Sequence, residues 1–244
     1  MRRRLLQLTP GEKMPFDRFY CPGELRNKVL LSGQELHHLQ HVMRIVVGEE
    51  VELVNGNGTL AHARVSAFKK EAVELEITHT IHEPRPAHTV SLAVPLMRPA
   101  KLEFVLEKGT ELGADAFYLY PADGSEKSDL SANALERLRY VTVSALKQSG
   151  RLYLPSIAVV RTLDEVLAQE GTLLFGDTRP EAPWLQPQPG TPVTLITGPE
   201  KGFSEREVAL LEKKARGIRL SSHILRAETA PMAGLAILGC GSGR

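Results

Sequence analysis

The residues best suited to chemistry lie in two polar segments near the C-terminal end of the chain. The first segment, residues 195–204 (LITGPEKGFS), leads from an apolar run through Gly198 and Gly202 to Ser204, a predicted helix cap. Glycine lets a ligand approach the backbone, and the free amides at a helix N-terminus favour polar or anionic groups. A tight strand-to-helix turn without any ligand is an equally good interpretation of the same residues. The sequence contains neither GxGxxG nor GxxxxGK[ST], which argues against a dinucleotide fingerprint and a P-loop.

The second segment, residues 220–231 (LSSHILRAETAP), is predicted to connect a short strand to an apolar helix that begins near Pro231. Arg226 and Glu228 beside such a helix are costly unless they are paired or used. A structural Arg–Glu pair that orients the loop and a contact with a substrate are both compatible with this sequence.

The elements that position these segments belong to the second of two predicted domains, residues 1–82 and 83–244. The proline-rich stretch at residues 83–88 (EPRPAH) is typical of a linker. Before it, alternating apolar residues, an Asn-Gly hairpin signal at 55–58 and one helix near 33–43 predict a small β-barrel-like domain.

After the linker, predicted strands and helices alternate, which favours an α/β domain with a mainly parallel sheet and ligands at the carboxyl ends of its strands. The expected strands are residues 90–95, 116–120, 157–160, 173–175, 193–197 and 218–220. The expected helices are residues 102–112, 133–150, 204–215 and 231–238, with capping boxes at Asn133/Glu136 and Ser204/Glu207, a short helix capped by Thr162 and Glu165, and an apolar, buried last helix.

The composition excludes several classes of protein. The chain of 244 residues is 42% hydrophobic with a formal net charge of +1. Lys+Arg and Asp+Glu number 11 and 10 up to residue 82 and are equal after it, so any RNA contact must come from a local patch. No apolar run approaches the ~18 residues of a membrane span, and a cytoplasmic location is expected.

Metal and disulfide chemistry have weak support in the sequence. Two cysteines, Cys21 and Cys240, rule out a disulfide framework and a Cys-rich zinc site. His37 and His41 form an i, i+4 pair, but a third ligand at matching spacing is missing, so we expect no metal. The basic residues 2–4 are expected to form a solvated tail.

Several motifs in the same order resemble one family along residues 18–240. They are HHL and VMR at 37–44, KGTELG at 108–113, QSGR at 148–151, GPEKGFSEREV at 198–208 and LSSHILRAETAPMAGLAIL at 220–238. Together they resemble the ribosomal RNA uridine-N3 methyltransferases of the RsmE type, in the SPOUT superfamily. The chain departs from the family pattern at Lys201, where the family has glycine, and at Ser222 and His223, where it has Gly and Arg.

The resemblance implies a PUA-like RNA-binding β-barrel followed by an α/β domain with a deep trefoil knot. Such proteins are homodimers that bind S-adenosylmethionine in the knot and need no metal. The implied reaction is methylation of N3 of a uridine in 16S ribosomal RNA. The alternative is an RNA-binding protein of the same fold without methyl transfer, which the three departures keep open.

Three loops after predicted strand ends are expected to build the cofactor pocket. The expected pocket residues are Gly176, Ile196, Thr197, Gly198, Pro199, Glu200, Gly202, Leu220, Ser221, Ile224 and Leu225, with Ile196, Leu220 and Leu225 enclosing the adenine. Arg226 is the candidate for stabilising a uridine anion, and Glu200, if buried, and Glu228 complete the catalytic candidates. The expected RNA contacts are Arg18, His37, His38, Arg44, Lys108 and Arg151.

Overall fold

The computed structural model describes residues 17–125, 127–188 and 190–239. The basic residues 2–4 and Cys240, which the sequence singles out, lie outside this described part. The chain divides into two compact units, Met1–Pro84 and Arg85–Arg244, each with its own hydrophobic core. Within the described residues, no helix is both long enough and apolar enough to span a membrane.

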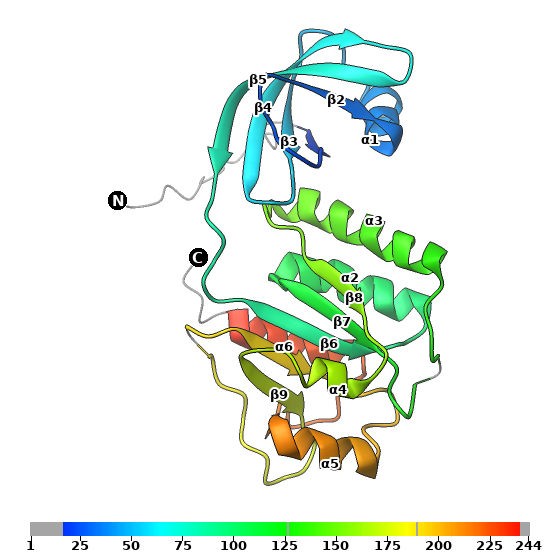
Figure 1. Ribbon diagram of the computed structural model, residues 1–244, viewed down its shortest axis with the longest axis vertical. Coiled ribbons are helices and arrows are strands. Elements are labelled where there is room, and N and C mark those ends of the chain that lie inside the picture. The colour runs from blue at the N-terminus through cyan, green and yellow to red at the C-terminus, as the bar shows by residue number, and fades with distance from the viewer. Residues whose placement is uncertain (1–16, 126, 189, 240–244) are drawn as a thin grey trace. The chain divides into compact units, whose positions relative to one another are not determined.

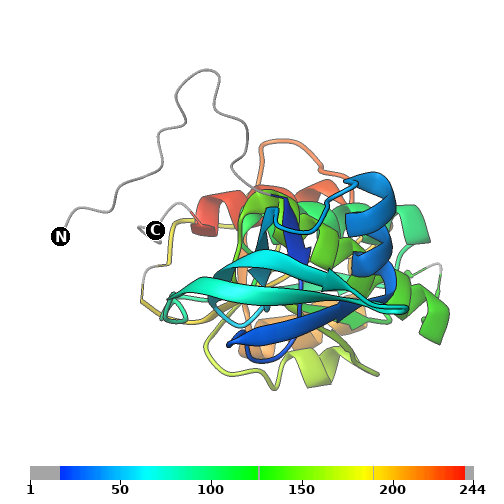
Figure 2. The same ribbon diagram turned by 90° about the horizontal axis from the view of Figure 1, so that it is seen from above.

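The first unit is a five-stranded mixed sheet with the order β1-β3-β4-β5-β2 (Figure 1). Its strands are β1 (Arg18–Tyr20), β2 (Lys28–Ser32), β3 (Glu50–Val54), β4 (Thr59–Phe68) and β5 (Ala72–His82). Figure 2 shows the long strands β4 and β5 side by side. The predicted hairpin turn joins β3 and β4, where the Asn55 side-chain oxygen accepts hydrogen bonds from the backbone N–H groups of Asn57 and Thr59.

The single helix predicted near residues 33–43 has two parts. It begins as α1 (Gly33–His37) and continues as the π-helical segment η1 (His38–Val42), in which the Met43 N–H donates to the His38 carbonyl at 3.0 Å. Leu39 is fully buried in the core of the unit. Arg44 follows with φ of 57°, in the left-handed region that a side chain rarely adopts.

The second unit alternates strands and helices around one sheet, as predicted. Its elements are β6 (Val90–Pro95), α2 (Pro99–Leu112), β7 (Ala116–Tyr120), α3 (Ala132–Ser149), β8 (Ser156–Val159), α4 (Leu163–Val166), β9 (Thr172–Gly176), β10 (Val193–Ile196), α5 (Glu205–Lys214), β11 (Arg216–Ile218) and α6 (Thr229–Gly239). Every neighbouring pair in the order β11-β9-β10-β6-β7-β8 is parallel, which confirms the predicted parallel sheet.

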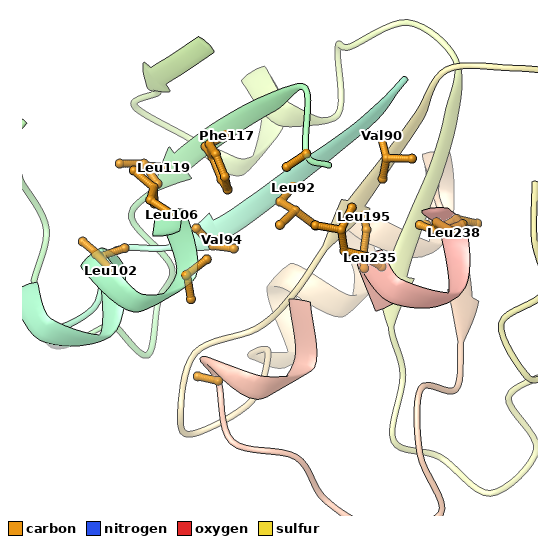
Figure 3. Close-up of a cluster of buried hydrophobic side chains, with 14 of the residues drawn as sticks. Val90, Leu92, Val94, Leu102, Leu106, Phe117, Leu119, Leu195, Leu235 and Leu238 are labelled. Carbon is orange, nitrogen blue, oxygen red and sulfur yellow. The ribbon is translucent and has the colours of Figure 1, made fainter. Parts of the chain in front are cut away.

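Helices cover both faces of this sheet. On one face, strands β6 and β10 pack against helices α2 and α6. This cluster includes Leu92 of β6, Leu195 of β10, Leu106 of α2 and Leu235 of α6 (Figure 3). On the other face, α4 and α5 pack over a second cluster. Helix α6 lies very close to β10: a Cβ added at Gly234 would be 2.2 Å from a side-chain carbon of Leu195. The predicted burial of α6 is confirmed for Pro231, Gly234, Leu235 and Leu238, whereas Thr229 and Ala236 are exposed and the other positions are partly buried.

Several predicted element ends are shifted in the structure, and two of the shifts change a cap and a loop. The cap of α3 is Ser131, whose hydroxyl accepts from the Ala134 N–H, rather than Asn133. Strand β11 ends at Ile218, opposite Gly176 at the end of β9, so Leu220 lies in the following loop. The predicted capping box of α5 and the Thr162 cap of α4 are confirmed.

Candidate functional site

A cavity of about 510 Å³ lies where β9, β10 and β11 end. Three loops line it, residues 176–178, parts of 197–203, and 219–227, together with Lys101 and Ala230. The register explains their convergence, because Ile196 of β10 pairs with Phe175 of β9, and Ile218 of β11 pairs with Gly176. Carboxyl ends of parallel strands meet at one edge, which is where α/β folds bind ligands.

Ten of the eleven predicted pocket residues line this cavity, and Ile196 does not. The ten are Gly176, Thr197, Gly198, Pro199, Glu200, Gly202, Leu220, Ser221, Ile224 and Leu225. Side chains alternate along a strand, so Leu195 packs toward α6 while Ile196 is fully buried in the opposite cluster with Phe175. The expectation that Ile196 encloses the adenine is therefore not supported by its position.

The glycines shape the loop after β10. A Cβ added at Gly198 would lie 3.3 Å from ring carbons of Phe203, which itself packs edge-to-face on Phe175 at 6.1 Å between ring centres. Gly202 has φ of 77°, which favours glycine. Lys201 is exposed and does not line the cavity. The left-handed turn thus depends on Gly202, and the lysine before it is not part of the cavity lining.

Thr197 offers the cavity an unsatisfied polar atom. The residue is 1% exposed and lines the cavity, and among the described residues its hydroxyl has no hydrogen-bond partner. Its carbonyl accepts from the Tyr120 hydroxyl at 2.8 Å. Burial, and then the charge of Glu207, raises the pKa of Tyr120, which keeps this phenol a donor. A buried polar group without a partner is costly, so the Thr197 hydroxyl favours a polar ligand.

A lysine from α2 joins the two polar segments. The Lys101 ammonium lies 2.8 Å from Glu200 Oε1 and 3.2 Å from Glu228 Oε2. Hydrogen bonding to Glu200 is the largest cause of the raised pKa of Lys101. Burial alone would raise the pKa of Glu228, but its backbone N–H and Lys101 outweigh burial and lower it. Glu228 does not line the cavity, whereas Glu200 does and has a side chain 29% exposed.

Arg226 does not form the structural pair with Glu228 that the sequence left open. It is exposed and lines the cavity, and among the described residues its guanidinium takes part in no ion pair or hydrogen bond, while Glu228 pairs with Lys101. Its carbonyl accepts from the N–H groups of Thr229 and Ala230 at the start of α6. The backbone is therefore fixed while the cation remains available to a ligand.

Two of the predicted RNA contacts, Arg18 and Arg151, have partners within the protein. Arg18 donates twice to Glu52 at 2.8 and 2.6 Å, with side chains 18% and 9% exposed. Arg151 is nearly buried and donates to the carbonyls of Thr110 and Ala114 at 2.9 and 2.7 Å. Both guanidinium groups are therefore already engaged within the protein.

The remaining predicted RNA contacts differ in availability. Lys108 lies 2.8 Å from each of two glutamates on its own helix, which neutralises it. His38 is partly buried, with its ring 5.6 Å from that of Phe19. His37 and Arg44 are exposed. Within the described ranges, no three His, Cys, Asp or Glu side chains gather as a metal site.

The cavity residues that sequence reasoning missed come mostly from flanking positions. Phe203, Arg219 and Ala227 adjoin predicted residues, Ser222 and His223 lie inside the predicted loop 220–225, Thr178 lies two residues after Gly176, and Ala230 lies in the first turn of α6. Lys101 is different, because it lies about a hundred residues earlier in the chain. Its spacing of seven from Lys108 places both on one helix face, but spacing alone does not reveal its partners.

Comparison with known families gives two matches. Residues 83–239 match an RNA methyltransferase domain, and residues 31–78 match an RNA methyltransferase PUA domain. The chain is 31% identical to a ribosomal RNA small subunit methyltransferase E from Synechocystis over 85% of its length and 71% of that protein. It is 29% identical to the protein of that name from Bacillus subtilis, over 85% and 88% of the two chains.

Solved structures agree with these matches. A methyltransferase from Legionella pneumophila in complex with the cofactor SAM has a TM-score of 0.83, with 25% identity over 92% of this chain and 97% of that one. A ribosomal RNA small subunit methyltransferase E from Neisseria gonorrhoeae bound to S-adenosyl methionine has a TM-score of 0.81, with 27% identity over 91% and 96%. These likenesses confirm the predicted fold class, a SPOUT-type α/β domain after a PUA-like domain.

Proposed function

The chain belongs to the ribosomal RNA small subunit methyltransferase E family, and from this premise we propose that it methylates N3 of a uridine in 16S ribosomal RNA. At the coarser level, it is an RNA methyltransferase that uses S-adenosylmethionine. The motifs at residues 198–208 and 220–238 support the choice of uridine N3, since they resemble the uridine-N3 methyltransferases.

The observation that carries the proposal is the cavity at the ends of β9, β10 and β11. Its size suits a nucleoside-sized ligand, and the Thr197 hydroxyl, buried without a partner among the described residues, fits a polar group there. We assign the holding of S-adenosylmethionine to the loops of Gly176, Gly198 and Leu220. When bound, S-adenosylmethionine supplies a methyl group on a positively charged sulfur.

The protein's own side chains act on the uridine. The N3 proton must leave before N3 can form a bond to carbon, and the resulting negative charge spreads over O2 and O4. A guanidinium is suited to pair with two such oxygens, and Arg226 is exposed at the cavity with its guanidinium in no ion pair or hydrogen bond among the described residues. Arginine stays protonated, so its role is to stabilise the anion.

Glu200 is the proposed proton acceptor, and Glu228 is a positioning residue. Glu200 lines the cavity, but its side chain is 29% exposed and lies 2.8 Å from the Lys101 ammonium, so the burial that the sequence argument required is absent. We therefore assign most of the effect to stabilisation of the uridine anion by Arg226. Glu228 forms the second ion pair of Lys101, at 3.2 Å.

For the first unit we propose RNA docking through an exposed patch that includes His37 and Arg44. A few well-placed cations suffice for phosphate contacts in a chain of near-neutral charge. The division into an RNA-binding domain at 1–82 and a methyltransferase domain at 83–244, a homodimer, a cytoplasmic location and activity without metal complete the proposal, as the family resemblance implies.

Primer extension on ribosomal RNA from a deletion strain tests this function. Methylation at N3 blocks Watson–Crick pairing, so reverse transcription stops at the methylated uridine. A stop that is present with wild-type RNA, absent in the deletion strain and restored by the gene supports the proposed function. Complementation with Gly198→Val should fail, because its side chain would fill space already 3.3 Å from Phe203 and displace the loop. Calorimetry should show that this folded variant no longer binds S-adenosylmethionine. If wild-type protein leaves the RNA unmethylated and binds no cofactor, the RNA-binding alternative is correct.

A further inference from the structure

Trp184, the single tryptophan of the chain, is exposed next to Arg219, which lines the cofactor cavity. It lies in the proline-rich connection between β9 and β10 and is 52% exposed. Two backbone hydrogen bonds connect its neighbours to Arg219, which follows β11. The Leu185 N–H donates to the Arg219 carbonyl at 2.9 Å, and the Arg219 N–H donates to the Pro183 carbonyl at 2.8 Å. Leu185 is buried and anchors the segment. The backbone therefore holds the indole outward in a defined place.

Arg219 links the indole to the cavity. Its guanidinium carbon lies 5.1 Å from the centre of the Trp184 ring, a cation–π contact, and its Nη1 donates to the Pro180 carbonyl at 3.3 Å. Arg219 also lines the cavity. The partly exposed cation of Arg219 therefore lies at the cavity assigned to the cofactor, and the exposed ring of Trp184 lies next to it.

We propose that Trp184 and Arg219 form a stacking platform for an unpaired nucleobase of the substrate RNA, next to the uridine that is methylated. The inference rests on the proposed function. A base reached at N3 cannot remain paired, so its strand is locally opened and a neighbouring base loses stacking partners. An exposed indole replaces such stacking without demanding a particular base, and an adjacent guanidinium can contact the phosphate of the same nucleotide.

The single tryptophan provides a direct binding test with the full-length protein. Titration with oligouridylate should quench the Trp184 fluorescence, whereas inorganic polyphosphate, a polyanion without bases, should quench it far less. Equal quenching by both probes, or none by oligouridylate, would overturn the proposal, because stacking requires a base.

Kinetics with ribosomal RNA supply the second test. Trp184→Ala should raise the KM for RNA by at least about fivefold, in line with the loss of one base–aromatic stack, and leave S-adenosylmethionine binding unchanged. Tyr140→Ala removes an aromatic side chain of similar exposure on α3 and should behave like wild type. A normal KM in Trp184→Ala refutes the platform. A change of Trp184→Ala from dimer to monomer in sedimentation assigns the indole to an interface between copies and refutes it as well.

The two proposals fail in different ways. If wild-type protein transfers no methyl group to ribosomal RNA, the proposed function is wrong whatever the fluorescence shows. If wild-type protein is active and Trp184→Ala retains its KM, only the stacking platform is wrong.

Discussion

Replacing Arg226 tests whether its cation acts in catalysis or only stabilises the fold. The side chain is exposed and contacts no carboxylate among the described residues, so Arg226→Met should change the free energy of unfolding by only about 0.5 kcal/mol or less. Loss of one group that stabilises a developing anion lowers kcat about 10²–10³-fold, or roughly 3–4 kcal/mol of transition-state stabilisation. Arg226→Lys should recover little of this, because an ammonium cannot pair with two oxygens in the same plane.

Three measurements on each variant decide the matter: kcat with ribosomal RNA, calorimetric binding of S-adenosylmethionine, and urea unfolding. Lys101→Met is the matched control, since it removes a cation that has partners, 2.8 and 3.2 Å from two carboxylates. Because these groups are partly exposed and screened by solvent, the control should lose about 1 kcal/mol of stability or less. If Arg226→Met instead loses stability and cofactor affinity together, Arg226 is structural and its assignment to the uridine anion is wrong.

Three other perturbations test the packing, the docking patch and the ion pairs. Gly234→Ala should lower the free energy of unfolding, measured in urea, by about 1–3 kcal/mol, because its Cβ would lie 2.2 Å from a leucine side chain of β10. Gly239→Ala, whose Cβ would have its nearest contact at 3.7 Å, should be almost neutral. Equal effects of the two substitutions would contradict the close approach of α6 to β10. Arg44→Glu should weaken RNA binding and reduce its salt slope by about 1 without altering cofactor affinity, and an unchanged slope would remove Arg44 from the patch. Since the pKa of Glu228 is lowered in the folded state, the stability it contributes is present above its ordinary value of 4.5 and is lost as the pH falls through the lowered value. Lys101→Met should reduce this loss of stability on acidification, and identical pH profiles of unfolding would show that Lys101 does not lower the pKa of Glu228.

The three loops of the cavity could be predicted because they depend on local signals. An apolar strand, a glycine turn and a capped helix are encoded within a dozen residues, and parallel strands bring such turns to one edge. The wrong placement of Ile196 shows the limit of this argument. Neither Ile196 nor its neighbour Leu195 lines the cavity, because each is buried in a core cluster on one face of the sheet; the lining begins at Thr197.

Charged pairs between distant segments were beyond prediction. Arg18 meets Glu52 because β1 and β3 are parallel with these two residues in register, and the sequence did not indicate β1 as a strand. Lys101 meets Glu200 only after α2 has packed on the sheet. Such contacts follow from the assembled fold, so the sequence could leave open a pair between Arg226 and Glu228 but could not show that Lys101 is the residue that pairs with Glu228.

The π-helical turn of η1 has a genetic consequence. A π turn holds one residue more than an α turn, and here the extra residue lies between the buried Leu39 and the exposed Arg44. Point substitutions at its exposed positions leave that spacing intact. Loss of a single codon would let the turn close as an ordinary α-helix, and because a π turn and an α turn each complete one revolution, the residues after it would keep their direction about the helix axis. Along this stretch, therefore, the π turn accommodates one residue more than an α-helix would without changing the direction in which Arg44 leaves the helix.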